Sequence, residues 1–263
     1  MLEIYQELVN VTSKGERAVL ATVISSRGSA PRKAGAKMLI KNDGTFIGTV
    51  GGGGVEQQVQ EKAIEVMNSG EPQIVHFDLS GRGEEAAMIC GGQMDVFLEP
   101  IVPLETLYLF GAGHISQSTA VMGKMLGFGV VVIDPRPEYN NSDRFPDADS
   151  LIVEEYDSAF SKLNVDEDSY IVIYTTGHVL DEQCLRFAVG TKAKYIGMIG
   201  SKKKVKEVKE HLLQEGISQQ QLDRVCAPIG IEIGAETPQE IAISILAEII
   251  KVKRTNSAKG EGV

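Results

Sequence analysis

Residues 107–114 read Leu-Tyr-Leu-Phe-Gly-Ala-Gly-His, an apolar run of strand length that leads into a Gly-x-Gly turn. The first glycine of such a turn, Gly111, permits a tight bend, and the second, Gly113, lets a phosphate approach the backbone at the positive N-terminus of a helix. Asp134 ends the next apolar run, at about the 20-residue separation at which an acidic residue binds a ribose diol. Ser116 stands where the full motif has its third glycine. The stretch indicates a nucleotide-type site, and the alternative is a doubly wound domain whose glycine turn merely packs tightly.

Strands and helices alternate from residue 106 onward. Apolar runs predict strands at residues 106–110, 129–133, 151–153, 170–174, 195–199 and 224–227, and helical spacing predicts helices at 115–126, 180–191 and 202–213. Thr237-Pro238-Gln239-Glu240 is a capping box that predicts the start of a last helix. Strands that are apolar on both faces and alternate with helices indicate a doubly wound, Rossmann-like parallel sheet that is covered on both sides.

The first hundred residues predict a mixed α+β domain. An opening helix precedes apolar runs at 18–24, 36–40 and 45–49, and Asn42-Asp43-Gly44 between the last two is a hairpin signal. A helix follows the glycines at 51–54 and stops at Gly70, and strands are predicted at 73–78 and 94–99. Pro100 and Pro103 favour an extended linker. We therefore expect an N-terminal domain at 1–100, a Rossmann-like domain at 104–253 and a frayed tail at 254–263.

The composition is that of an acidic, globular protein. The chain has 263 residues, of which 43% are hydrophobic, and a formal net charge of −10. An acidic balance argues against nucleic acid or an anionic membrane surface as the main partner, because both attract basic faces. No apolar stretch reaches the ~20 residues that a bilayer requires, and the start has no secretory signal. The three cysteines, Cys90, Cys184 and Cys226, form no Cys-x-x-Cys pair, which favours the reducing cytoplasm over a disulfide framework or a zinc site.

Candidate binding residues lie where the predicted parallel strands end. In a doubly wound fold a ligand sits beyond the carboxyl ends of the strands, where the strand order reverses. His114 follows the first strand, and His178 with Asp181 follows the fourth, so we expect both histidines at one crevice. Gly200-Ser201 follows the fifth strand and leads into three lysines, which oppose the helix dipole unless an anion binds there. Histidines that only cap or hydrogen-bond, and a solvated cationic turn, are the alternatives.

Two glycine-rich loops of the first domain are further candidates. Gly52, Gly53 and Gly54 open a helix whose N–H groups can cradle an anion, and Arg32 upstream adds a cationic group. Cys90-Gly91-Gly92 places a thiol on a loop before a strand, where a positive neighbour would make the thiolate reactive. A buried, inert thiol is the alternative for Cys90, and Cys184 is expected on the core face of its helix.

Nine segments taken together resemble one family. In chain order they are Gly28-Ser-Ala-Pro-Arg32, Gly51-Gly-Gly-Gly-Val55-Glu56, Cys90-Gly-Gly92 with Phe97-Leu-Glu-Pro100, Phe110-Gly-Ala-Gly-His114, Asp134-Pro-Arg-Pro137, Thr176-Gly-His178, Tyr195-Ile-Gly-Met-Ile-Gly-Ser201, Pro228-Ile-Gly230 and Ile233-Gly-Ala-Glu-Thr-Pro-Gln-Glu-Ile-Ala242. Each segment alone is a weak signal, but their order is highly specific. Over nearly the whole chain the series resembles the xanthine dehydrogenase accessory (XdhC/CoxI) family.

This resemblance implies an N-terminal domain particular to the family, followed by a Rossmann domain. It implies a cytoplasmic maturation factor, commonly a homodimer, that holds the molybdenum cofactor (molybdopterin) as cargo. Such a factor supports sulfuration of the cofactor, with a cysteine desulfurase as the sulfur source, and delivers it to a xanthine dehydrogenase-type apoenzyme. The first hypothesis is therefore a cofactor chaperone without turnover.

One position departs from the family pattern. The glycine loop of the family usually reads Gly-Gly-Cys before the Val/Leu-Glu pair, and Gly54 stands at the cysteine position here. Cys90 therefore becomes the candidate for handling sulfur.

The cargo has two ends with different needs. Its phosphate suits glycine turns, helix N-termini, Arg32 or the lysines at 202–204. Its reactive end needs a shielded crevice, expected between the two domains near His114 and His178 or at the 51–54 loop.

Two other functions remain open. An NAD-dependent oxidoreductase is suggested by Gly111, Gly113 and Asp134, although no Tyr-x-x-x-Lys pair occurs. A nucleotide-sensing regulatory protein would use the same turn.

Overall fold

The structure is a computed structural model that describes residues 2–79 and 92–257 of the chain. The chain forms two compact units, Met1–Pro103 and Leu104–Val263, which we call unit 1 and unit 2. Each unit has a sheet and a hydrophobic core of its own.

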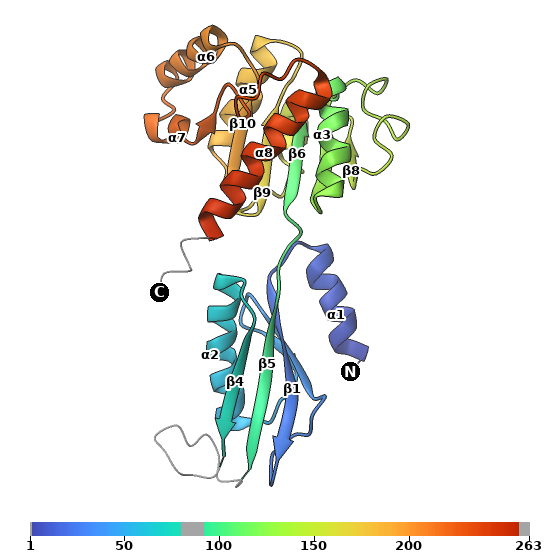
Figure 1. Cartoon of the computed structure of the whole chain (residues 1–263), viewed down its shortest axis with the longest axis vertical. Coiled ribbons are helices and arrows are strands. Elements are labelled where there is room, and N and C mark those ends of the chain that lie inside the picture. The colour runs from blue at the N-terminus through green and yellow to red at the C-terminus, as the bar shows by residue number, and fades with distance from the viewer. Residues whose placement is uncertain (1, 80–91, 258–263) are drawn as a thin grey trace. The chain divides into compact units, whose positions relative to one another are not determined.

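Unit 1 contains an antiparallel sheet of five strands in the order β3-β2-β1-β5-β4 (Figure 1). Gly44, with a φ of 80°, and Asp43, whose carboxylate accepts the Thr45 N–H at 2.9 Å, close the turn between β2 and β3. This turn confirms the predicted hairpin. The strands are β1 (Ala18–Arg27), β2 (Lys37–Lys41), β3 (Phe46–Gly48), β4 (Gln73–Asp78) and β5 (Gln93–Ile101).

Helices α1 (Leu2–Ser13) and α2 (Gly53–Ser69) cover opposite faces of this sheet. Successive side chains of a strand point to opposite faces, so Leu20 of β1 packs in the α1 cluster while its neighbour Ala21 packs in the α2 cluster. Helix α2 ends as predicted at Gly70, which has a left-handed φ of 70°.

Unit 2 contains a parallel sheet of six strands in the order β11-β10-β9-β6-β7-β8. Numbered along the unit from β6 and read from β8, this order is 3-2-1-4-5-6, the arrangement of the Rossmann fold. The predicted fold class is therefore confirmed. The strands are β6 (Thr106–Phe110), β7 (Gly129–Ile133), β8 (Ser150–Ile152), β9 (Ser169–Ile173), β10 (Tyr195–Met198) and β11 (Val225–Cys226).

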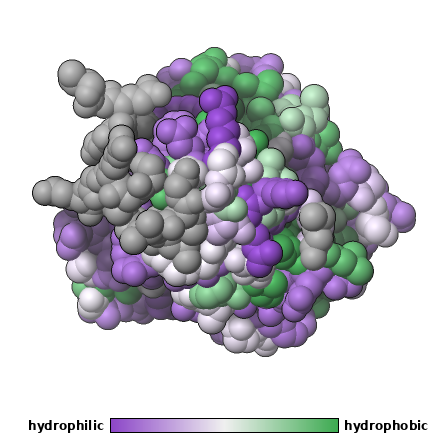
Figure 2. Space-filling model, turned by 90° about the horizontal axis from the view of Figure 1, so that it is seen from below, coloured by the Kyte–Doolittle hydropathy of each residue, from purple (hydrophilic) through white to green (hydrophobic). Residues whose placement is uncertain are grey.

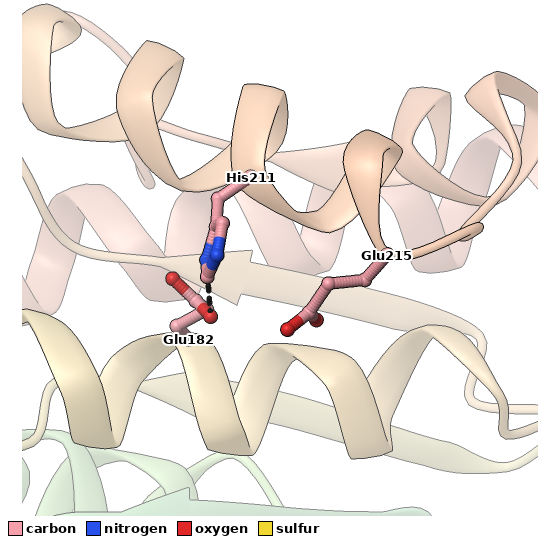
Figure 3. A group of neighbouring side chains, drawn as sticks. All are labelled: Glu182, His211 and Glu215. Atoms are coloured by element: carbon pink, nitrogen blue, oxygen red, sulfur yellow. Dashed lines mark hydrogen bonds and ion pairs between the residues drawn. The ribbon is translucent and has the colours of Figure 1, made fainter.

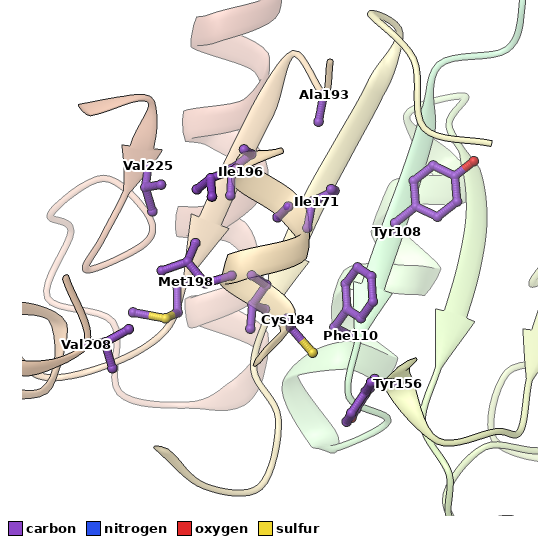
Figure 4. Close-up of a cluster of buried hydrophobic side chains, with 14 of the residues drawn as sticks. Tyr108, Phe110, Tyr156, Ile171, Cys184, Ala193, Ile196, Met198, Val208 and Val225 are labelled. Atoms are coloured by element: carbon purple, nitrogen blue, oxygen red, sulfur yellow. The ribbon is translucent and has the colours of Figure 1, made fainter. Parts of the chain in front are cut away.

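Helices cover both faces of the parallel sheet. Leu107 and Leu109 of β6 share a core with α3 and α8, whereas Tyr108 and Phe110 share the opposite core with α4, α5, α6 and α7 (Figure 4). Burial on both faces explains why these strands read as continuous apolar runs. The helices are α3 (His114–Met125), α4 (Tyr156–Phe160), α5 (His178–Val189), α6 (Lys202–Gln214), α7 (Gln219–Asp223) and α8 (Pro238–Ser257).

The last helix is longer than expected. It begins with the predicted capping box, in which the Thr237 hydroxyl accepts the Glu240 N–H at 3.3 Å and the Glu240 carboxylate accepts the Thr237 N–H at 3.0 Å. It then continues to Ser257, so residues 254–257 are helical and not part of a frayed tail. Tertiary contacts hold the turn before this extension, where Val252 packs on the core and the Lys253 ammonium lies 5.1 Å from the centre of the Phe128 ring. Residues 258–263 lie outside the described chain.

Two further differences concern short elements. Helices α4 and α7 have five residues each, which is too short for helical periodicity to be read from sequence. Residues 100 and 101, expected in a linker, belong to β5, where Pro100 lies opposite Val19. Strand β4 pairs with β5 only as far as Leu98. Pro100 therefore has no partner in β4, and its lack of an N–H costs no hydrogen bond with that strand.

No helix among the described residues is both long enough and apolar enough to cross a bilayer. On the face drawn in Figure 2, hydrophilic and hydrophobic side chains are interspersed. In unit 2, Met125 of α3 is 81% exposed and Ile243 of α8 is 50% exposed, and both line an apolar groove of about 300 Å³ between these helices.

Candidate functional site

The carboxyl ends of β6 and β9 are neighbours in unit 2. The Tyr174 N–H donates to the Phe110 carbonyl at 3.0 Å, which joins the two strand ends where the strand order reverses. Gly111 follows β6 with a φ of 111°, and a Cβ on this residue would lie 2.6 Å from the Tyr174 carbonyl oxygen. Gly111 is therefore required by close packing of the turn against β9.

Asp134 stands beside this turn as predicted, but its carboxylate is occupied by the protein itself. Oδ1 accepts from the Arg136 N–H at 3.0 Å and from Arg136 Nε at 2.9 Å, and Oδ2 accepts from the Ala112 N–H at 2.9 Å and from Arg136 Nη2 at 2.7 Å. A carboxylate has about four acceptor positions, and all of them are filled. Asp134 is 1% exposed and has no acceptor left for a ribose diol in this conformation.

The pKa of Asp134 agrees with a role inside the protein. Burial by itself raises the pKa of Asp134, but the hydrogen bonds and charge of Arg136 and the Ala112 N–H outweigh burial and hold the pKa below its ordinary value. The carboxylate therefore stays ionised and ties the β7 loop to the glycine turn.

Two arginines near this turn were not among the residues predicted to bind a ligand. Arg136 is paired with Asp134, and the side chain of Arg136 remains 32% exposed. Arg144 Nη2 donates to the Ala112 carbonyl at 3.3 Å and to Gln117 Oε1 at 2.9 Å. The Tyr139 ring lies 4.2 Å from the Arg136 guanidinium carbon and 5.4 Å from that of Arg144. Only the Asp134-Pro-Arg-Pro137 motif gave a sequence signal for this pair, and Arg144 gave none.

Helices α3 and α5 begin at glycines and have no side-chain cap. Their N-cap residues are Gly113 and Gly177, and neither helix start has a side-chain hydrogen bond. Among the described residues, and apart from its neighbours in the chain, nothing lies within 4 Å of a Cβ built on either glycine. The first N–H groups of both helices are therefore open to an anionic ligand.

His114 and His178 are the first residues of α3 and α5, and both are exposed. The structure places them at the same edge of the sheet. Asp181, which was expected to join them, is instead completely buried and accepts from the Thr175 N–H at 2.9 Å and from the Thr175 hydroxyl at 2.7 Å. It also binds the Lys204 ammonium, so its role is to hold the loop.

The turn at Gly200 and Ser201 reaches the same edge from β10. The Ser201 hydroxyl accepts the Lys204 N–H at 3.2 Å and caps α6. Lys204 is held by Asp181, whereas Lys202 and Lys203 are exposed. Of the three predicted lysines, two therefore present charge to solvent at this edge.

The glycine motifs of unit 1 also meet in space. A Cβ on Gly51 would lie 2.9 Å from Pro31 Cγ, and a Cβ on Gly92 would lie 2.6 Å from the Arg27 carbonyl oxygen. Residues 27–31 thus contact both loops, and the exposed Arg32 follows directly. Helix α2 begins after Gly52, again with no side-chain cap. Gly53 and Gly54 are its first two residues, so the 51–54 loop is a second candidate anion site.

The structure describes two of the three cysteines, and both are at least partly buried. Cys90 and Gly91 lie outside the described residues. Cys184 is completely buried in the core of unit 2, as predicted (Figure 4), and burial raises the pKa of its thiol. Cys226 is partly buried, and burial together with the charge of Glu248 raises the pKa of its thiol to about 11. Neither described cysteine is a reactive thiolate.

The fold and the carboxyl edge of the parallel sheet define an α/β protein with a Rossmann unit. The glycine turn of this unit is stabilised by Asp134. Residues 107–249 match the family model described as the XdhC Rossmann domain, and residues 11–78 match that of the XdhC and CoxI family. The chain belongs to the XdhC and CoxI family.

Three relatives and one solved structure extend this finding. The chain is 34% identical to the uncharacterized protein YqeB of Escherichia coli over 98% of its own length but spans only 47% of that relative. It is 25% identical to a probable xanthine dehydrogenase subunit of Bacillus subtilis, covering 91% of the chain and 94% of the relative. It is also 25% identical to the molybdenum cofactor insertion chaperone PaoD of Escherichia coli, covering 93% and 86%. A crystal structure described as a xanthine dehydrogenase from Bacillus halodurans aligns with a TM-score of 0.53 and 26% identity over 96% of both chains.

Proposed function

We propose that this protein is a maturation factor that binds the molybdenum cofactor and delivers it to a xanthine dehydrogenase-type apoenzyme. The names of two relatives support this role, because one is a molybdenum cofactor insertion chaperone and the other a probable xanthine dehydrogenase subunit. A cytoplasmic location and a homodimer belong to the same proposal and rest on the family resemblance.

The observation that carries the proposal is the chemistry of the carboxyl edge of unit 2. Uncapped helix starts at Gly113 and Gly177 and the exposed Lys202 favour a phosphate, while the filled Asp134 carboxylate disfavours the ribose of a dinucleotide. The terminal phosphate of molybdopterin needs N–H donors and cations and does not need an acceptor for a ribose diol. This difference favours the cofactor over NAD.

Sulfuration is the finer part of the proposal. A cysteine desulfurase would supply the sulfur. Gly54, at the start of α2, has no thiol, so a sulfur-carrying role would fall to Cys90.

The test measures retention and delivery of the cofactor. The full chain is mixed anaerobically with molybdopterin cofactor released from a molybdoenzyme, or with NADH, and the bound ligand is measured after ultrafiltration. The loaded protein is then added to cofactor-free xanthine dehydrogenase. We expect retention of the cofactor, restored purine oxidation and no retention of NADH. Tight NADH binding with hydride transfer to an aldehyde or purine, without cofactor retention, would overturn the proposal.

A matched pair of variants tests the position of the phosphate. Asp and Asn both cap helices well, and Gly113 has an extended backbone (φ −75°) with free space around its Cβ. Gly113→Asp and Gly113→Asn should therefore fold equally well. If the phosphate binds at α3, both variants retain less cofactor than the wild type, because either side chain caps the N–H groups that the phosphate would use. The aspartate variant then retains at least about tenfold less than the asparagine variant, because its charge repels the phosphate. Equal retention by both variants would assign the phosphate to another loop.

A further inference from the structure

Three potential metal ligands meet where α5 packs against α6, on the outside of unit 2. They are Glu182 of α5, His211 of α6 and Glu215, which is the C-cap residue of α6 (Figure 3). One ligand atom from each residue lies within 4.8 Å of the others. The Glu182 side chain is 19% exposed, and those of His211 and Glu215 are 55% and 37% exposed. An ion from solvent can therefore reach all three.

The spacing of these residues suits a chelate. His211 and Glu215 are four residues apart, so they project from one face of the same helix. Glu182 approaches from the neighbouring helix, with Oε1 2.8 Å from His211 Nδ1. Ligands of one tetrahedral zinc ion, at bond lengths of 2.0–2.2 Å, lie about 3.3–3.6 Å apart. The longest separation in the group must therefore shrink by only about 1–1.5 Å, a movement that an exposed glutamate makes by rotating its side chain.

Arg186 is the competitor for these carboxylates. Its guanidinium contacts Glu215 Oε2 at 2.5 Å and Glu182 Oε1 at 3.0 Å. The Arg186 side chain is 43% exposed, so it can turn into solvent when an ion replaces it. Without the metal the arginine neutralises the two glutamates, and with the metal it is displaced.

We propose that Glu182, His211 and Glu215 form a binding site for a divalent transition-metal ion, with Zn²⁺ as the best match to one imidazole and two carboxylates. Water completes the coordination of the ion, as is usual for zinc held by three protein ligands. The ion links α5 to α6 through residues that are not among those proposed to bind the cofactor phosphate, so either proposal can fail without the other.

The test counts bound zinc in variants of the full chain. Protein treated with EDTA and then freed of it is titrated with ZnCl₂ by calorimetry, in a buffer that does not bind metals. We expect His211→Ala and Glu182→Gln to lose one equivalent of zinc, or to bind it at least tenfold more weakly. His76→Ala is the matched control, because His76 also contacts a carboxylate, Asp95 at 2.7 Å, but belongs to no group of three ligands among the described residues.

Removal of the competitor separates a metal site from a simple ion-pair cluster. Arg186→Ala should bind zinc severalfold more tightly, because the glutamates are then free, and zinc should raise its melting temperature more than that of the wild type. If the group is only an ion-pair cluster, Arg186→Ala lowers stability and zinc does not restore it. That result, or unchanged zinc binding in His211→Ala, would overturn the proposal. Circular dichroism of each variant verifies its fold.

Discussion

Replacing Gly111 with alanine should destabilise unit 2 strongly, whereas the same change at Gly113 should not. The new methyl group at Gly111 would lie 2.6 Å from the Tyr174 carbonyl oxygen and 3.0 Å from its carbon, and the residue has a φ of 111°. Both contacts are with backbone, so a side-chain rotation cannot relieve them. Overpacking costs about 1–3 kcal/mol, and a non-glycine residue in such a backbone conformation costs about 1–3 kcal/mol more. We therefore expect a loss of about 2–6 kcal/mol.

Gly113→Ala is the internal control, since this residue has an extended backbone (φ −75°) and, beyond its chain neighbours, no atom of the described residues lies within 4 Å of its Cβ. Its cost should stay below about 1 kcal/mol, the effect of a poorer N-cap residue. Urea unfolding and thermal melting measure both variants, and a unit of this size loses about 2–4 °C per kcal/mol. Gly111→Ala should melt at least about 2 °C below Gly113→Ala. Equal melting temperatures would refute the conclusion that Gly111 is required for packing.

Two further predictions concern charge. Since the pKa of Asp134 is lower in the folded protein than in the unfolded chain, its contribution to stability is complete above the unfolded pKa of about 3.9 and is lost as the pH falls through the folded value. Between pH 5 and 3, the free energy of unfolding of Asp134→Asn should therefore fall by less than that of the wild type. An equal fall in the two proteins, measured by urea unfolding at each pH, would contradict this. Lys202 is exposed in the first turn of α6, where a cation opposes the helix dipole, so Lys202→Gln should raise the stability of the cargo-free protein by about 0.3–1 kcal/mol at low salt. The gain in stability should fade at high salt. The same substitution should weaken cofactor retention. Unchanged stability at low salt would contradict an unfavourable charge at position 202.

Most of the fold was readable from sequence because its signals are local. Buried strands β6 and β7 appear as apolar runs with the predicted bounds, and the capping box at Thr237 contains both of its partners within four residues. The differences arose where distant contacts act. The C-terminal part of α8 contacts Phe128 through Lys253, and β5 can contain Pro100 because β4 stops pairing with β5 at Leu98.

The candidate site was predictable in part. Sequence placed the Gly111 turn, His114 and His178 at one edge, because parallel strands of a doubly wound sheet end together. It did not predict that Arg136 occupies the Asp134 carboxylate. A carboxylate about 20 residues after a glycine turn reads the same whether it faces a ribose or a neighbouring guanidinium.

By itself, the sequence determined the family, the alternation of strands and helices and the turns that need glycine, since each depends on residues close together in the chain. Only the tertiary structure decided the partners of the polar side chains. The path of the β7–β8 loop brings Arg144 to the Ala112 carbonyl, and the packing of α5 on α6 brings Glu182 to His211. Such pairings depend on how separate elements approach one another in space, which hydrophobic periodicity does not encode.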